Sequence, residues 1–204
     1  MEGAKKLAER EGIRTLRVGL ATATSNLGTN VVQAVLTIFA LRTLRFTTAE
    51  LGLVGSIGAV GFLAGVLVVN RFTTKVGLGR TLALSIAVPG VFVLYPLAAL
   101  GYPFLVLAGV SFVVGLSVPS YNVNQISLRQ AITPDRLQGR MNATMRTIVW
   151  GTIPVGSLLG GLLGNNVGVV DTMYTGGAIA ALAGAWIALG PVIKLKRQPE
   201  PVRS

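Results

Sequence analysis

Polar side chains that could bind a ligand recur along one apolar stretch near the start of the chain. Asn26, Asn30 and Gln33 stand three or four residues apart and share one helical face with Thr22, Thr29 and Thr37. Amides donate and accept hydrogen bonds but do not titrate. In hydrocarbon an amide is costly unless it has a partner, so this face must meet other helices or a watery cavity. We favour a cavity wall; hydrogen bonding that only holds helices together is the alternative.

A second polar group follows Pro119 and includes Tyr121 and Asn124. A helix broken at Pro119 would free carbonyl groups for a substrate or water, although neighbouring helices can satisfy such groups equally well. Two helices of this kind could line one pathway. The candidate contacts for a substrate in the cavity are Asn26, Asn30, Gln33, Tyr121 and Asn124.

The composition excludes most catalytic chemistry. The chain contains neither Cys nor His, which removes thiol nucleophiles, disulfides, catalytic triads and zinc sites with nitrogen or sulfur ligands. Its 7 acidic residues lie in the tails, in connections or near the ends of apolar runs, so no carboxylate pair is placed for general acid and base work. We therefore expect no enzyme, no metal site and no cofactor.

Hydrophobic residues make up 51% of the 204 residues and charged residues only 12%, whereas a soluble domain carries roughly 25% charged residues. A bilayer accommodates such a surface if each span supplies about 20 apolar residues. Only helices suit runs of this length, because a backbone in lipid must satisfy its own hydrogen bonds. The sequence predicts an all-α polytopic membrane protein with six transmembrane helices, near residues 16–41, 50–69, 81–100, 104–127, 142–163 and 172–193.

These spans divide the chain into a cytoplasmic N-terminal segment (1–15), a transmembrane domain (16–193) and a basic cytoplasmic tail (194–204). The net charge of +11 comes from basic residues between the apolar runs, and aromatics are only 6%, so we do not expect nucleic-acid binding. With cytoplasmic termini, all of the 18 Lys and Arg residues except Arg42 and Arg45 lie inside. The positive-inside rule therefore predicts a multi-pass protein of the cell membrane with both termini cytoplasmic.

Glycines four residues apart predict close packing of helices. Gly61 and Gly65 lie in the second span, and Gly156, Gly160 and Gly164 lie in the fifth. Small residues on one face let neighbouring backbones approach closely, which is how membrane helices pack. Sliding surfaces for a conformational change are the alternative interpretation.

The connection between the fourth and fifth spans has a recognisable pattern, Ser127–Gln130 and Thr133–Met141, followed by Gly151, Pro154 and Gly156–Gly161. Within it, Thr133, Pro134 and Asp135 predict a helix start with Thr133 as N-cap. The pattern resembles the major facilitator superfamily, in the branch of the enterobactin exporter and related drug efflux proteins. There a similar segment joins the tenth and eleventh of twelve helices. The corresponding motif residues are Arg129, Asp135, Arg136, Gly139 and Arg140.

The resemblance implies two six-helix halves around a central cavity, each half built from three-helix repeats. On that mapping the chain is the C-terminal half, and its first span is helix seven. The implied function is secondary transport by alternating access, with export of a small organic molecule such as a drug or siderophore. The alternative is a non-transporting interaction or assembly subunit, or a truncated relic.

The expected partners are the lipid bilayer, a small-molecule substrate of unknown identity, and either a missing N-terminal half or a second copy of the chain. The region from Gly65 to Arg80 resembles the family's cytoplasmic loop signature. Val69 stands where that signature has an acid, with Asn70 beside it.

Overall fold

The computed structural model describes residues 2–133 and 135–196, and of these it describes only the backbone for 2–11, 132 and 135–137. The described residues are almost entirely helical and contain no strand, which confirms the all-α prediction. The α-helices are α1 (Glu2–Ile38), α2 (Thr48–Val76), α3 (Leu78–Ala87), α4 (Pro103–Ile132), α5 (Asp135–Asn166) and α6 (Val169–Ala188). The other helices are the π-helix η1 (Phe39–Thr43) and the 3-10 helices η2 (Val88–Leu100) and η3 (Pro191–Lys194).

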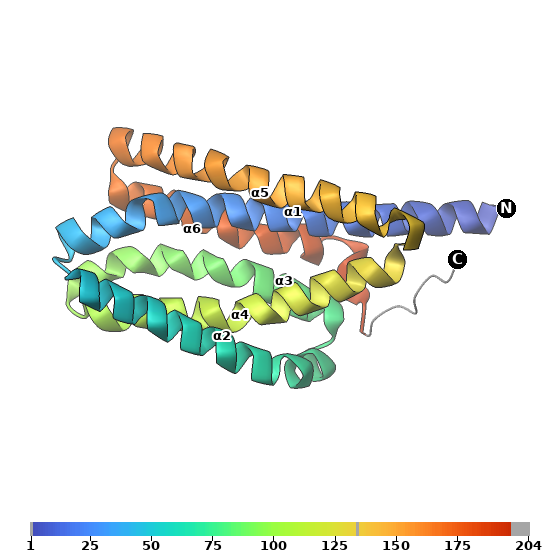
Figure 1. The fold of residues 1–204 in the computed structure, drawn as a ribbon, viewed down its shortest axis with the longest axis horizontal. Helices are drawn as coiled ribbons and strands as arrows, with labels where there is room; N and C mark the ends of the chain where they lie inside the picture. The colour runs from blue at the N-terminus through green and yellow to red at the C-terminus, as the bar shows by residue number, and fades with distance from the viewer. Residues whose placement is uncertain (1, 134, 197–204) are drawn as a thin grey trace.

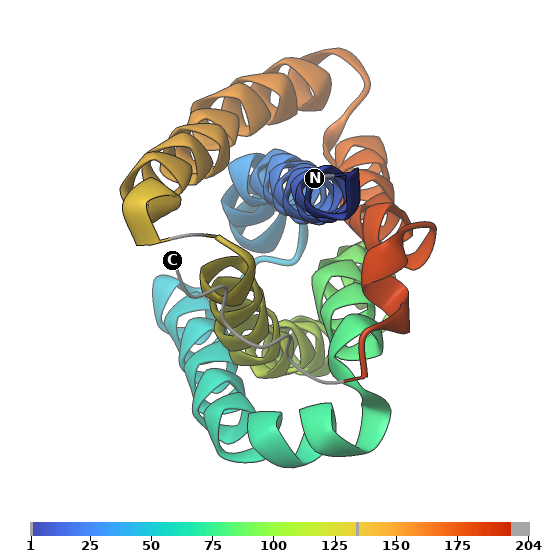
Figure 2. The ribbon, with the colours of Figure 1, turned by 90° about the vertical axis from the view of Figure 1, so that its right-hand side faces the viewer.

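The helices form an elongated bundle in which α3 and η2 together make one rod (Figure 1). We call the end at which α1 begins and α4 meets α5 the terminal end. Viewed from the terminal end, α2 and α5 lie on the outside of the bundle (Figure 2). The connections from η1 to α2, from η2 to α4 and from α5 to α6 lie at the opposite end.

In chain order the rods form two groups of three: α1, α2 and the α3–η2 rod, followed by α4, α5 and α6. The first helix of each group packs on the other group. The helix α1, which opens the first group, packs on α5 and α6 of the second. In the same way α4, which opens the second group, packs on α2 and on η2 of the first. This exchange agrees with a fold built from two three-helix repeats.

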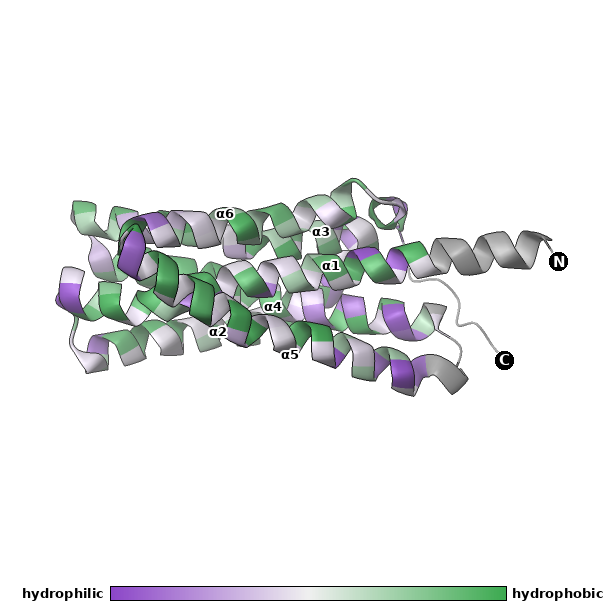
Figure 3. Cartoon of the chain, turned by 90° about the horizontal axis from the view of Figure 1, so that it is seen from above, coloured by the Kyte–Doolittle hydropathy of each residue, from purple (hydrophilic) through white to green (hydrophobic). Residues whose placement is uncertain are grey.

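Within the part of the chain that the structure describes, four rods are long and apolar enough to span a membrane: Thr48–Val76, Leu78–Leu100, Pro103–Ala131 and Gln138–Asn166. The charged start and the polar face of α1 lower the hydropathy of that helix, and α1 packs against α6. Hydrophobic residues occur along all the rods (Figure 3). Large apolar side chains are exposed on α2 and α5, such as Leu63, Leu67, Leu158 and Leu162, and form a surface suited to lipid.

Helix extends beyond the predicted spans at two places. Residues 2–15, predicted to precede the first span, continue α1 as helix. The expected basic connection 70–80 is helical as far as Val76, and Gly77 alone separates α2 from α3. Its φ of 92° lies in a region that glycine adopts without a steric penalty.

The third rod changes its hydrogen bonding at Val88, where the sequence predicted a continuous helix. Pro89 and Pro96 have no N–H to donate, and η2 continues for 13 residues as a 3-10 helix. Such helices rarely exceed three or four residues, so packing must stabilise this one. Phe92 and Tyr95 are 2% exposed, and their rings stack with centroids 5.3 Å apart.

The last rod ends earlier than predicted, because Gly190 and Pro191 follow α6 and cannot continue it. The chain then crosses to the start of α3. There Gly79 N–H donates to the Leu195 carbonyl at 2.8 Å, and Leu78 N–H donates to the Lys196 carbonyl at 3.3 Å. These bonds satisfy donors that the first turn of a helix leaves free.

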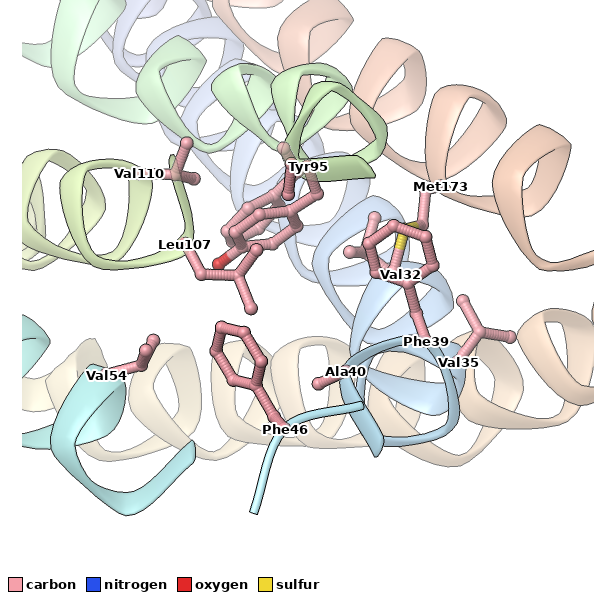
Figure 4. Packing of buried hydrophobic residues seen from close by; sticks show 12 residues of the cluster. Val32, Val35, Phe39, Ala40, Phe46, Val54, Tyr95, Leu107, Val110 and Met173 are labelled. Atoms are coloured by element: carbon pink, nitrogen blue, oxygen red, sulfur yellow. The ribbon is translucent and has the colours of Figure 1, made fainter. Parts of the chain in front are cut away.

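An apolar cluster lies towards the end of the bundle opposite the terminal end. Figure 4 shows how its side chains pack. Phe39, Phe46 and Leu107 belong to it, and the rings of Phe46 and Phe104 lie 6.4 Å apart. A second cluster around Leu82, Leu128 and other buried residues packs nearer the terminal end.

Candidate binding cavity

A cavity of about 600 Å³ lies between α1, the α3–η2 rod, α4 and α5. Its volume falls within the usual range for small-molecule sites. The polar residues that line it are Thr22, Ser25, Asn26, Thr29, Ser85, Ser117, Tyr121, Asn122, Gln125, Arg129, Asn142 and Arg146.

The polar face of α1 forms one wall of the cavity. Thr22 Oγ1 donates to the Val18 carbonyl at 2.8 Å, and Ser25 Oγ donates to the Ile86 carbonyl at 3.4 Å. The amide of Asn26 and the hydroxyl of Thr29 follow along the same face. This wall therefore offers neutral hydrogen-bonding groups.

The facing wall comes from α4. Tyr121 is 5% exposed, and its Oη lies 2.6 Å from Thr22 Oγ1 and 3.3 Å from the Val18 carbonyl that it donates to. Pro119 does not break the helix, because α4 continues from Pro103 to Ile132. The predicted break at this proline is therefore wrong. Because Pro119 has no N–H, the carbonyl of Gly115, four residues earlier, has no donor within the helix. The helix nevertheless continues past Pro119.

The cavity is positively charged on its α4 and α5 sides. Arg129 of α4 is partly buried, and its Nε is buried without a hydrogen-bond partner. The Arg146 guanidinium carbon lies 5.9 Å from the centroid of the Trp150 ring, also a lining residue, in a cation–π arrangement. Among the described residues, no Asp or Glu lines the cavity.

A family model described as Major Facilitator Superfamily matches residues 18–204, nearly the whole chain. The chain belongs to the major facilitator superfamily. A search of the curated proteins gave no match. This membership, with the apolar helices, makes the chain a multi-pass membrane protein of a family of secondary transporters.

The cavity of this major facilitator protein contains some of the predicted contacts and not others. Asn26 and Tyr121 line it together. Asn30 lies beside Gly156 of α5, and its Nδ2 donates to the Asn26 carbonyl at 2.8 Å. Gln33 is exposed and is not among the lining residues.

Asn124 faces α2 and lies outside the cavity. Its Nδ2 donates to Thr73 Oγ1 at 3.0 Å and to the Ser120 carbonyl at 2.7 Å. This amide therefore links α4 to α2.

The residues of the loop motif fall in different places. Arg129 lines the cavity, whereas Gly139 and Arg140 are exposed near the start of α5. The side chains of Asp135 and Arg136 lie outside the described residues, as does Pro134 of the predicted helix start. α5 begins at Asp135, and Gln138 Nε2 donates to the Thr133 carbonyl at 3.4 Å.

Neither Arg146 nor Trp150 was predicted as a member of the site, whereas Gln125 belongs to the polar group that follows Pro119. Arg146 counted only as a topology signal, although it lies within an apolar helix four residues before Trp150. An ionisable residue inside a membrane span is by itself a sign of function. That rule could have identified it.

The five glycines selected for packing all meet a neighbouring helix. Gly61 and Gly65 face α4, and Gly156, Gly160 and Gly164 face α1. A Cβ on Gly65 would lie 2.5 Å from the Leu116 carbonyl oxygen, and one on Gly160 would lie 2.5 Å from that of Val31. No real Cβ comes so close, so the backbones here can approach only because the residues are glycine.

Proposed function

We propose that this chain is the C-terminal six-helix half of a major facilitator exporter, in the branch of the enterobactin exporter and related drug efflux proteins. In this proposal it moves a small organic molecule out of the cell by alternating access. The pattern of residues 127–141 supports the branch and the half. The observation that carries the proposal is the polar cavity of about 600 Å³ between α1 and α4.

The cavity suits one wall of a transport pathway. Substrate sites in such transporters lie near the middle of the membrane, at the interface between repeats. α1 and α4 each open a three-helix group, and their polar faces meet at this cavity. Apolar residues such as Val114 and Val118 share the lining, which is the mixture expected of a small-molecule site.

A second six-helix unit would complete the pathway. Gln33 is exposed on the polar face of α1, and Trp150, at the edge of the cavity, is 65% exposed. A polar group and an aromatic ring left uncovered beside a cavity suit contact with another protein surface across a pathway. We propose that the unit is either an N-terminal half or a second copy of this chain.

We also propose that the terminal end faces the cytoplasm and that the membrane is the cell membrane. Apart from Arg146, which lies within α5, the described Lys and Arg residues gather at the terminal end, with Arg42 and Arg45 at the other end. The positive-inside rule favours this orientation.

Single cysteines can test alternating access without knowledge of the substrate, because the chain has no Cys of its own. Thr29→Cys places a thiol on the cavity wall, Gln138→Cys places one at the terminal end, and Pro103→Cys places one at the opposite end. A membrane-impermeant maleimide is applied to intact cells and to inverted vesicles. We expect Gln138→Cys to react only in inverted vesicles and Pro103→Cys only in cells.

The decisive variant is Thr29→Cys, which alternating access should expose from each side in turn. An assembly subunit without transport predicts reaction from one side at most, and that result would refute the proposed function. Reaction of Gln138→Cys in intact cells would show that the proposed orientation is wrong and that the terminal end faces outwards.

A further inference from the structure

We infer that the cavity takes an organic anion with an apolar body, held with its anionic group against Arg129 and Arg146. The inference rests on the proposed function, in which this cavity is the substrate site, and it adds the chemical class of the substrate. Both arginines line the cavity, Arg129 on α4 and Arg146 on α5.

The charge of the cavity is not balanced by the residues around it. Arg129 and Arg146 each carry a guanidinium, and among the described residues no carboxylate lines the cavity. The Nε of Arg129 is buried without a hydrogen-bond partner. A buried cationic donor without an acceptor is costly, so a ligand that brings an anionic acceptor would remove that cost.

The groups next to the arginines suit an anion as well. Gln125 is buried one turn before Arg129, and Asn142 lies one turn before Arg146. Both line the cavity, and each amide supplies N–H donors. Guanidinium groups bind carboxylates and phosphates through paired hydrogen bonds, so the anionic group should lie here.

The other part of the cavity suits an apolar body. Ile86 and Pro89 of the third rod and Val114 and Val118 of α4 contribute to its lining. Along the length of the bundle, these residues lie further from the terminal end than Arg129 does. An amphipathic anion would therefore point its charged group towards the terminal end.

A cationic substrate is disfavoured by the same residues. Two aromatic residues line the cavity, and Arg146 already lies over the ring of Trp150. The other, Tyr121, is buried against α1. A second cation would be repelled by both arginines, and no described lining residue offers a negative charge.

Tryptophan fluorescence gives a direct test, since the chain has only 2 Trp residues and Trp150 lines the cavity. In a Trp186→Phe background, Trp150 is the single reporter. The 204-residue chain is placed in nanodiscs of zwitterionic phosphatidylcholine. It is titrated with 4-phenylbutanoate, 4-phenylbutanamide and 4-phenylbutylammonium, which share one apolar body and differ in charge.

We expect the emission of Trp150 to change with 4-phenylbutanoate at concentrations where the amide and the ammonium have no effect. Arg146→Gln and Arg129→Gln should each weaken that binding by about tenfold or more, the usual effect of losing a hydrogen bond to a charged group. Arg129→Lys keeps the charge but loses the paired hydrogen bonds, so its affinity should lie between those of the native protein and Arg129→Gln, which shows that the site still folds. Arg71→Gln removes the same charge from an exposed position on α2, outside the cavity, and should change nothing.

Three results would overturn the inference. Equal binding of the amide or the ammonium, or unchanged affinity in both glutamine variants, would refute an anionic substrate and leave the proposed transport intact. No response to any of the three probes would refute the ligand site itself. The proposed transport is judged separately, by the two-sided labelling of Thr29→Cys, which uses no ligand.

Discussion

Thr22 Oγ1 and Tyr121 Oη lie 2.6 Å apart, so a pair of hydroxyl groups joins α1 to α4 at the wall of the cavity. Both hydroxyls also bond to the Val18 carbonyl oxygen, at 2.8 Å and 3.3 Å respectively. α1 and α4 touch at few other points. This shared hydrogen bonding therefore links the two helices that supply the polar walls.

Tyr121→Phe should lower the free energy of unfolding by roughly 0.6 kcal/mol, the average for a hydrogen bond between membrane helices. The loss is small because Thr22 keeps its bond to Val18 and no group is left without a partner. Denaturant unfolding in mixed micelles measures it. The matched control is Tyr174→Phe, which removes the same hydroxyl from an exposed position on α6 and should have no effect. Equal losses in the two variants would contradict the role of the hydroxyl pair.

Gly160 and its neighbour Gly161 provide a test of helix packing at adjacent positions. A Cβ on Gly160 would lie 2.5 Å from the Val31 carbonyl oxygen, whereas one on Gly161 would meet nothing within 4 Å. Gly160→Ala should force α5 away from α1 and cost about 1–3 kcal/mol, as overpacking usually does. Gly161→Ala should be neutral or stabilise the helix by up to about 1 kcal/mol. Thermal unfolding of both variants checks the difference, and a stable Gly160→Ala protein would show that the two helices can separate at no cost.

The sequence was sufficient to predict the helical class because each span needs a long apolar run, and only helices satisfy a backbone in lipid. It was less informative about where each helix begins and ends. Thr47 and Glu50 form a capping box, with Thr47 N–H bonded to Glu50 Oε2 at 2.7 Å, and this readable signal starts α2 at Thr48. The change to 3-10 hydrogen bonding at Val88 depends on packing against distant residues, so local sequence does not determine it.

The cavity could be predicted only in part. The spacing of polar residues placed Asn26 on a polar face, but spacing alone does not say which neighbour covers each position. Asn30 and Asn124 have the same side chain as Asn26, yet one lies beside Gly156 and the other bonds to Thr73. Tertiary packing therefore places these three amides in different surroundings.

A stop codon after Lys194 should destabilise the start of α3. It removes the carbonyl groups of Leu195 and Lys196, which accept from the Gly79 and Leu78 amides. Each lost bond should cost about 1 kcal/mol, and both amides should exchange their hydrogens faster. Hydrogen exchange with mass spectrometry measures the effect. A stop after Lys196 keeps both acceptors and serves as the control; if the two truncations exchange alike, these bonds do not hold α3.

Water access along α1 gives a prediction that needs no substrate. Asn26 lines the cavity, whereas Val32, less than two turns further along, is 0% exposed within the apolar cluster of Figure 4. A maleimide reacts with the thiolate, and an apolar surrounding raises the pKa of a thiol. Each unit of that rise lowers the thiolate fraction, and with it the rate, by about tenfold. Asn26→Cys should therefore react with a water-soluble maleimide at least about ten times faster than Val32→Cys.

The same comparison is made on the unfolded protein. There both thiols should react at the same rate, which shows that a difference in the folded protein comes from the fold. Thr24→Cys adds a control on the same helix, because Thr24 Oγ1 accepts from Trp186 Nε1 of α6 at 3.1 Å and is not among the residues that line the cavity. It should react more slowly than Asn26→Cys. If Asn26→Cys were as slow as Val32→Cys in the folded protein, water would not enter between α1 and α4, and the polar face of α1 would serve only to bind the helices together.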